Sequence, residues 1–302
     1  MATTISEATN SALTPLPLDL FKSEVDPDWC PGCGDFGVLR ALQIALAELS
    51  IRPEQALVSS GIGCSSNLPG FIHAYGFHGL HGRSMPVAVG AKLANPDLTV
   101  IVTGGDGDGY GIGVGHFIHA ARRNIDLTYI VMDNEVYGLT TGQASPTSEF
   151  DMRTKSTLEG NIEVPLNPLA LAISSGATFV ARGFSGEQKH LTDVMKRAIL
   201  HKGFSLVDVF SPCVTYNKQN TYPWFKERVY KLEETDYDPS DLNTAFVKAR
   251  EWGVAIPIGL LYKVDRPTYE ELEPALKRHG NPMRQRLGLT SEEGEQLLRE
   301  FM

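Results

Sequence analysis

The chain has 302 residues, which is enough for one large α/β domain. Its 36 Asp and Glu residues outnumber its 27 Lys and Arg residues, and the resulting net charge of −9 argues against nucleic acid and anionic membranes as main partners. No run of about 18 apolar residues occurs, so we expect no transmembrane helix.

The beginning of the chain differs in composition from the rest. Residues 1–20 are rich in Ser, Thr, Ala and Pro, carry few charges and do not resemble a signal peptide. We therefore predict a flexible N-terminal tail at 1–20, followed by one α/β domain at 21–264.

Apolar spacing predicts that helices and strands alternate through this domain. Helices are predicted at 37–49, 85–94, 112–123, 167–175 and 186–202, and strands at 56–60, 98–103, 127–132, 177–181, 204–210 and 255–262. Such alternation favours a doubly wound parallel sheet with helices on both faces. Residues 265–302 read as a polar tail with a helix at 291–301, which either lies on the surface or clasps a partner subunit.

The most specific pattern lies between Gly104 and Gln143. Strand 98–103 runs into Gly105-Asp106-Gly107, and strand 127–132 ends on Asp133-Asn134, so that Asn134 follows Asp106 by 28 residues. Ligands of parallel sheets bind at strand ends, and two oxygen donors on neighbouring ends suit Mg²⁺. The glycines allow a phosphate to approach the backbone, and the helix that follows offers its N-terminus to the anion.

This pattern resembles the GDG-then-Asn motif of thiamine diphosphate enzymes. The resemblance implies that Asp106, Asn134 and the carbonyl of Val136 hold Mg²⁺, with diphosphate oxygens and water as the other ligands. An EF-hand fits less well, because position 12 counted from Asp106 is Phe117 instead of Glu. A nucleotide loop fits less well too, since this stretch holds no G-x-G-x-x-G frame and no Walker lysine.

The cysteines form the second pattern. Cys30 and Cys33 form a C-x-x-C pair, while Cys64 and Cys213 each follow a predicted strand. Four thiolates gathered at one sheet edge suit a [4Fe–4S] cluster. Taken alone, the cysteines also leave open a zinc site, a redox dithiol at the first pair, or inert core thiols.

Together, the two patterns resemble the β subunit of 2-oxoacid:ferredoxin oxidoreductases. The resemblance runs from Val25 to Val264, and its motifs are, in chain order, WCPGCG at 29–34, GIGCSS at 61–66, HGR at 81–83, GDGD at 105–108, RRN at 122–124, Asn134 with YGLT at 137–140, CVT at 213–215 and NTY at 220–222. It implies that the chain is the kind of thiamine diphosphate-binding domain that holds the diphosphate group of the cofactor. It also implies that Cys30, Cys33, Cys64 and Cys213 ligate one [4Fe–4S] cluster.

The resemblance also assigns a cofactor pocket. The residues expected to touch thiamine diphosphate are Cys64, Ser65, Ser66, His81, Gly105, Asp106, Gly107, Asn134, Val136, Tyr137, Gly138 and Leu139. The two serines alternatively serve as caps. One position departs from many relatives, because Thr141 stands where they carry a Lys beside the substrate pocket.

The implied reaction is oxidative decarboxylation of a 2-oxoacid with coenzyme A, giving acyl-CoA, CO₂ and reduced ferredoxin, with 2-oxoglutarate favoured over pyruvate. No catalytic residue is assigned here, because the Glu that activates thiamine is expected on an α subunit. An oxygen-sensitive cluster and free thiols point to the cytoplasm. The alternatives are a non-redox thiamine diphosphate decarboxylase or synthase subunit with a structural zinc, and a scaffold subunit that binds the cofactor without catalysis.

Overall fold

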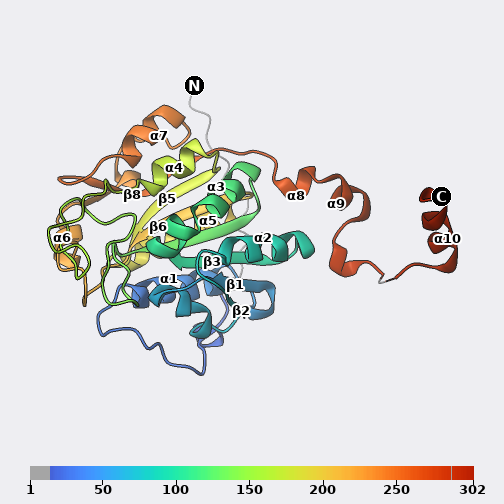
Figure 1. Cartoon of the computed structure of the whole chain (residues 1–302), viewed down its shortest axis with the longest axis horizontal. Coiled ribbons are helices and arrows are strands. Elements are labelled where there is room, and N and C mark those ends of the chain that lie inside the picture. The colour runs from blue at the N-terminus through green and yellow to red at the C-terminus, as the bar shows by residue number, and fades with distance from the viewer. Residues whose placement is uncertain (1–13, 287) are drawn as a thin grey trace.

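The computed structural model describes residues 14–286 and 288–302, and this part of the chain contains an eight-stranded sheet (Figure 1). The strand order is β2-β1-β3-β4-β6-β5-β8-β7. The strands are β1 (Ala56–Ser60), β2 (Tyr75–His78), β3 (Thr99–Gly105), β4 (Leu127–Asp133), β5 (Phe179–Phe184), β6 (Phe204–Phe210), β7 (Val229–Lys231) and β8 (Ile256–Lys263).

The predicted parallel sheet is confirmed for β1 to β6, which all pair in parallel. The exception is β8, which pairs antiparallel with β5 and parallel with β7. Two strands were not predicted: all four residues of β2 are exposed, and β7 has three half-buried residues. Neither strand has the apolar run or alternation from which strands are recognised.

Helices cover both faces of the sheet, as predicted. One core contains α1 and α5, and the other contains α2, α3, α4 and α7. Strand β3 serves both cores, because Ile101 faces the first while Val100 and Val102 face the second. The helices are α1 (Asp35–Glu48), α2 (Ser84–Ala94), α3 (Val114–Arg123), α4 (Pro168–Ser174), α5 (Gln188–Leu200), α6 (Tyr222–Lys226), α7 (Leu242–Ala249), α8 (Tyr269–Leu272), α9 (Pro274–His279) and α10 (Ser291–Glu300).

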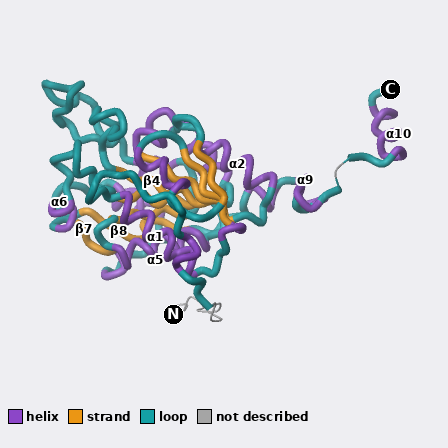
Figure 2. Tube along the Cα trace, turned by 90° about the horizontal axis from the view of Figure 1, so that it is seen from below, coloured by secondary structure: helices purple, strands orange, loops and turns teal. Residues whose placement is uncertain are grey.

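The two predicted tails are only partly described. Residues 1–13 of the N-terminal tail lie outside the described residues. The next segment contacts α1: the N–H of Leu16 donates to the carbonyl of Ala47 over 2.9 Å, and Phe21 is fully buried. At the other end, α8, α9 and α10 follow one another away from the sheet, and α10 lies apart from it in both views (Figures 1 and 2). No side chain of α10 is buried.

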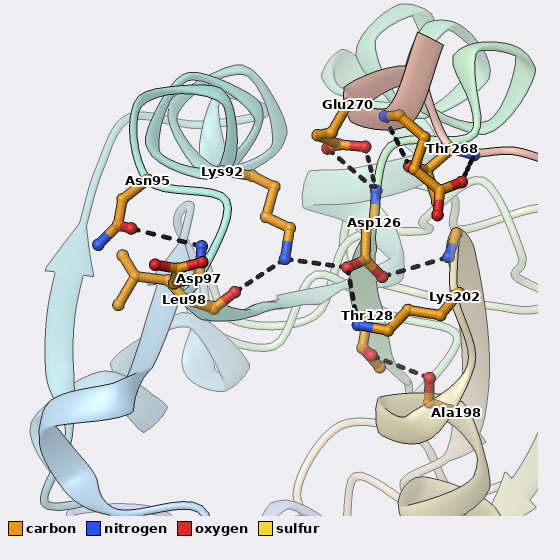
Figure 3. A network of polar contacts seen from close by, with 12 residues as sticks. Lys92, Asn95, Asp97, Leu98, Asp126, Thr128, Ala198, Lys202, Thr268 and Glu270 are labelled. Carbon is orange, nitrogen blue, oxygen red and sulfur yellow. Dashed lines mark hydrogen bonds and ion pairs between the residues drawn. The ribbon is translucent and has the colours of Figure 1, made fainter. Parts of the chain in front are cut away.

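A polar network ties the start of the C-terminal segment to the amino ends of the parallel strands (Figure 3). The Asp126 carboxylate, just before β4, lies 3.0 Å from the Lys92 ammonium and 3.5 Å from that of Lys202. Its backbone N–H donates to the carboxylate of Glu270. The amide of Asn124 donates to the carbonyls of Arg266 and Pro267 over 3.0 and 3.1 Å. Residues 266–270 are therefore fastened to the domain.

None of the helices in the described ranges combines the length and the apolar character that a membrane crossing requires.

Candidate functional site

The GDG segment lies where β3 ends. Strand β3 closes with Gly105, and Asp106, 1% exposed, leads into a π-helical turn at Gly107–Ile112 before α3. A β-carbon on Gly107 would lie 2.1 Å from the ring of Tyr137, whose hydroxyl donates to the Gly107 carbonyl over 3.1 Å. Gly107 is thus required by a side chain that packs against the turn, a reason for glycine that the sequence pattern did not reveal.

The Asn134 segment lies at the end of the neighbouring strand. The Asn134 side-chain oxygen accepts from the N–H of Val136 over 3.1 Å, and Glu135 between them has a φ of +56°. The carbonyl of Asn134 accepts from the amide of Asn217 over 3.0 Å, and the Ser148 hydroxyl donates to the carbonyl of Glu135. The loop that carries the proposed metal ligands is therefore held from two sides.

The structure brings nearly all predicted cofactor-binding residues to one cleft of about 60 Å³, which we call the GDG cleft. Ser66 is the exception: its side chain does not line the cleft, and its carbonyl accepts from the Ser60 hydroxyl over 2.6 Å. The lining residues are Ile62, Gly63, Cys64, Ser65, His81, Gly105, Asp106, Gly107, Asp108, Asn134, Val136, Tyr137, Gly138, Leu139 and Thr140.

Sequence reasoning missed Asp108, although it stands in the GDGD motif. Its Oδ1 accepts from the N–H of Ile62 over 2.9 Å and from the N–H of Gly82 over 2.7 Å, and His81 Nδ1 lies 3.3 Å away. A β-carbon on Gly61 would collide with this carboxylate. Asp108 therefore joins the loop after β1 to the loop before α2, and it places His81 at the cleft.

Thr147 was missed as well, because it lies in a loop without periodicity. Its hydroxyl lies 2.7 Å from Asp106 Oδ2 and 2.8 Å from Asp133 Oδ1. Burial raises the pKa of both carboxyls, and repulsion by Asp106 raises that of Asp133 further. A cation bound at Asp106 offsets this repulsion, so the residues present suit a metal ion.

The four cysteines surround a second cavity, of about 220 Å³, which we call the cysteine cavity. The N–H of Gly34 donates to the carbonyl of Pro212 over 3.2 Å, which holds the C-x-x-C loop against the end of β6. The Trp29 indole donates to the carbonyl of Cys64 over 2.7 Å. Burial raises the pKa of the Cys64 thiol to about 11, and the neighbouring groups Asp35 and Cys213 raise it too.

Among residues 14–286 and 288–302, no three His, Cys, Asp or Glu side chains are placed to hold a single metal ion. The cysteines do share one cavity, however, and four residues line both this cavity and the GDG cleft: Cys64, Asn134, Gly138 and Leu139. A β-carbon on Gly138 would lie 3.5 Å from the Cys64 sulfur and 3.9 Å from the Cys213 sulfur. The two cavities are separated by a wall of single residues.

Comparison with known families divides the chain into two matching parts. Residues 61–209 match the family described as thiamine pyrophosphate enzyme, C-terminal TPP binding domain. Residues 213–278 match the family described as the C-terminal part of the pyruvate ferredoxin oxidoreductase beta subunit. The first match covers the GDG cleft, and the second begins at Cys213.

Individual relatives agree with these matches. The 2-oxoacid:ferredoxin oxidoreductase subunit beta of Saccharolobus solfataricus is 52% identical over 81% of this chain and 84% of its own length. The 2-oxoglutarate oxidoreductase subunit KorB of Mycobacterium tuberculosis is 46% identical over 65% of this chain and 53% of its own. The solved 2-oxoglutarate:ferredoxin oxidoreductase of Magnetococcus marinus, with 2-oxoglutarate, coenzyme A and succinyl-CoA bound, superposes with a TM-score of 0.87 at 42% identity, covering 95% of this chain and 97% of that one.

Sequence, fold and relatives lead to one conclusion: the chain belongs to the β subunits of the 2-oxoacid:ferredoxin oxidoreductases, which are parts of a heteromeric enzyme.

Proposed function

We propose that this chain is the subunit that carries thiamine diphosphate and a [4Fe–4S] cluster in an enzyme that oxidises a 2-oxoacid with coenzyme A to acyl-CoA, CO₂ and reduced ferredoxin. The observation that carries the proposal is the wall shared by the GDG cleft and the cysteine cavity. A decarboxylation that releases electrons requires an electron acceptor close to the cofactor, and the shared wall provides that proximity.

The GDG cleft is the proposed cofactor site. Asp106, Asn134 and the carbonyl of Val136 would hold Mg²⁺, and His81 and Ser65 would contact the diphosphate. Thiamine diphosphate bound there supplies the electron sink for decarboxylation. Side chains of this chain position the site through hydrogen bonds. The Thr147 hydroxyl bonds to the Asp106 carboxylate, Asp108 accepts from the loop that bears His81, and the Tyr137 hydroxyl donates to the Gly107 carbonyl.

The cysteine cavity is the proposed cluster site, with Cys30, Cys33, Cys64 and Cys213 as ligands. A volume of about 220 Å³ has room for a cluster of eight atoms, and more room than one zinc ion needs. Because burial raises the pKa of Cys64 to about 11, the thiol stays protonated at neutral pH until iron replaces its proton.

The GDG cleft is only part of an active site. Its volume of about 60 Å³ is too small to enclose a thiamine diphosphate molecule. We propose that it is covered by an α subunit, which supplies the activating Glu, much of the 2-oxoacid pocket and the coenzyme A site. Ferredoxin is the proposed electron acceptor and the cytoplasm the proposed location. The proposed division of the chain remains a tail at 1–20, a domain at 21–264 and a partner-binding tail at 265–302.

For the substrate we propose 2-oxoglutarate. The support comes from relatives, since the Mycobacterium tuberculosis protein is named for 2-oxoglutarate and the Magnetococcus marinus enzyme was solved with 2-oxoglutarate bound. Thr141 is exposed and has a φ of +74° in the loop beside the GDG cleft. Its neutral hydroxyl leaves recognition of the second carboxylate of 2-oxoglutarate to the α subunit.

The test is anaerobic purification of this chain with and without its α subunit. We expect about four iron and four sulfide per chain, and a brown colour. The complex should reduce ferredoxin with coenzyme A and 2-oxoglutarate faster than with pyruvate, and the isolated chain should not turn over. Stoichiometric zinc without iron would establish the non-redox alternative. Rapid turnover by the isolated chain would disprove the proposal that this chain holds only part of the active site.

A further inference from the structure

A large cavity in the described part of the chain lies beside the proposed site and belongs to neither of its two halves. It has a volume of about 610 Å³ and shares no lining residue with the GDG cleft or the cysteine cavity. We call it the Glu135 cavity. It opens at the carboxyl ends of β4 and β6, and its walls include Asp133, Glu135, Arg182, Asp208, Phe210 and Trp252.

Glu135 is the unusual residue of this cavity. Its side chain is 1% exposed, and neither carboxylate oxygen has a hydrogen-bond partner among the described residues. Burying a carboxylate without a partner costs several kcal/mol, as an order-of-magnitude figure, so such groups are normally paired, neutralised by a proton or bound to a cation. Its backbone adds a second cost, since a Glu at a φ of +56° adopts a conformation that favours glycine.

The other charges in the cavity do not satisfy Glu135. Arg182 is buried against Asp208, with 3.9 Å between Nε and Oδ2, and its guanidinium stacks over the rings of Phe210 and Trp252. Asp208 also accepts from the Tyr110 hydroxyl over 2.8 Å. The positive charge of Arg182 is thus assigned to Asp208. Asp133, Glu149 and the exposed Arg250 also line the cavity, so its walls carry four carboxyl groups and two guanidinium groups, an acidic excess of two.

The mouth of the cavity is apolar and open. Val164 is 84% exposed and Trp252 40% exposed, and both line the cavity. Ile162 and Val254, two residues away on the same segments, are also exposed. Large exposed apolar side chains around a charged pocket are typical of a surface that another protein covers.

We propose that the Glu135 cavity receives a Lys or Arg side chain from the α subunit, and that apolar residues beside this side chain cover Val164 and Trp252. The proposal rests on membership in the β subunit family and on no step of the proposed reaction. A long cationic side chain fits a cavity of about 610 Å³ with aromatic walls better than a bare metal ion does. Charge complementarity with the acidic excess of the lining, of which Glu135 is the buried member without a partner, identifies the occupant as a cation.

Competition for the α subunit tests the proposal. Wild-type chain and Glu135→Gln, carrying different tags, are coexpressed with a limiting amount of α subunit, and the ratio of the two chains in the purified complex is measured. Glutamine keeps the shape and removes the charge, and loss of one member of a buried interfacial charge pair predicts a preference for wild type of about 30-fold or more. The matched control is Glu163→Gln, an exposed carboxylate on the same loop, which should be incorporated as well as wild type.

A second measurement does not depend on the folding of a variant. Hydrogen exchange of the wild-type chain should slow at 149–167 and 250–254 when the α subunit is added. Equal incorporation of Glu135→Gln, or unchanged exchange in both segments, would overturn the proposal. Spermidine or Ca²⁺ binding to the isolated wild-type chain but not to Glu135→Gln, with α subunit incorporation unaffected, would overturn it in favour of a small cation. None of these three outcomes would test the proposed thiamine and cluster sites.

Discussion

Polar groups at the amino ends of the parallel strands differ from those at the carboxyl ends in whether they have partners. We call these two sides of the sheet the amino edge and the carboxyl edge. At the amino edge, the side chains of Lys92, Asn124 and Asp126 all have hydrogen-bond or ion-pair partners. At the carboxyl edge, Asp108 and Glu135 are each buried with at least one carboxylate oxygen that has neither a hydrogen-bond nor an ion-pair partner among the described residues. Satisfied polar groups stabilise a fold, whereas unsatisfied ones are a cost that binding can repay. The amino edge is thus built for stability and the carboxyl edge for ligands.

The strongest test of this contrast is Asp106→Asn at the carboxyl edge. Mg²⁺-dependent affinity for thiamine diphosphate should fall by at least about 100-fold, since even indirect partners of a bound metal contribute 10- to 100-fold. The unfolding temperature should stay the same or rise, because the variant removes a buried charge. Calorimetry on the complex with the α subunit measures the first quantity and thermal unfolding the second. Unchanged cofactor affinity would disprove the metal assignment.

The opposite pattern is expected for Asn124→Ala at the amino edge. The Asn124 side chain donates to the carbonyls of Arg266 and Pro267, and accepts from the Thr178 hydroxyl over 2.6 Å and from the N–H of Phe204 over 2.9 Å. Leaving these buried groups unpaired should lower the free energy of unfolding by about 3 kcal/mol.

Urea unfolding measures this loss, and cofactor affinity should be unchanged. The control is Asn243→Ala on the exposed side of α7, which should have little effect on unfolding. A loss of cofactor affinity at Asn124→Ala would show that the two edges are coupled.

A smaller loss is expected for Lys92→Met. The Lys92 ammonium is 3.0 Å from Asp126 and donates to the carbonyl of Leu98 over 2.9 Å, and the residue is 5% exposed. The variant leaves Asp126 with Lys202 alone and should lower the free energy of unfolding by about 2 kcal/mol. Lys22→Met, which breaks an exposed ion pair with Asp19, is the matched control and should show no measurable change.

The smallest effect concerns pH. His201, bonded to the Thr178 hydroxyl over 2.8 Å, is buried, and burial lowers the pKa of its imidazole to about 4. The unfolded imidazole, with a pKa of 6.5, therefore takes up a proton before the folded one does. The contribution of His201 to stability is complete above pH 6.5 and is lost as the pH falls toward 4. By about pH 5.8 wild type should lose about 1 kcal/mol relative to His201→Gln in urea unfolding.

Much of this organisation could be predicted from the sequence. The central strands β3, β4 and β6 are buried apolar runs, and the motifs at their ends placed Asp106, Asn134 and Cys213 at one edge. The direction of β8 could not be predicted, because a strand buried on both faces reads the same in either orientation. The position of Thr147 and the missing partners of the Glu135 carboxylate depend on a loop with no regular sequence pattern, so only the folded structure could reveal them.

The wall between the GDG cleft and the cysteine cavity limits the ways in which this protein can change during evolution. At Gly138 a methyl group would already be in van der Waals contact with the sulfurs of Cys64 and Cys213, so any larger side chain would meet them. Residues on the wall face both cavities, so a substitution at Cys64 or Gly138 alters the GDG cleft and the cysteine cavity together. When one substitution on each side of the wall is combined in a double variant, the free-energy effects of the two should not add, because such residues share contacts. Changes in substrate preference are therefore expected to accumulate away from the wall, on loops such as that of Thr141 and on the α subunit.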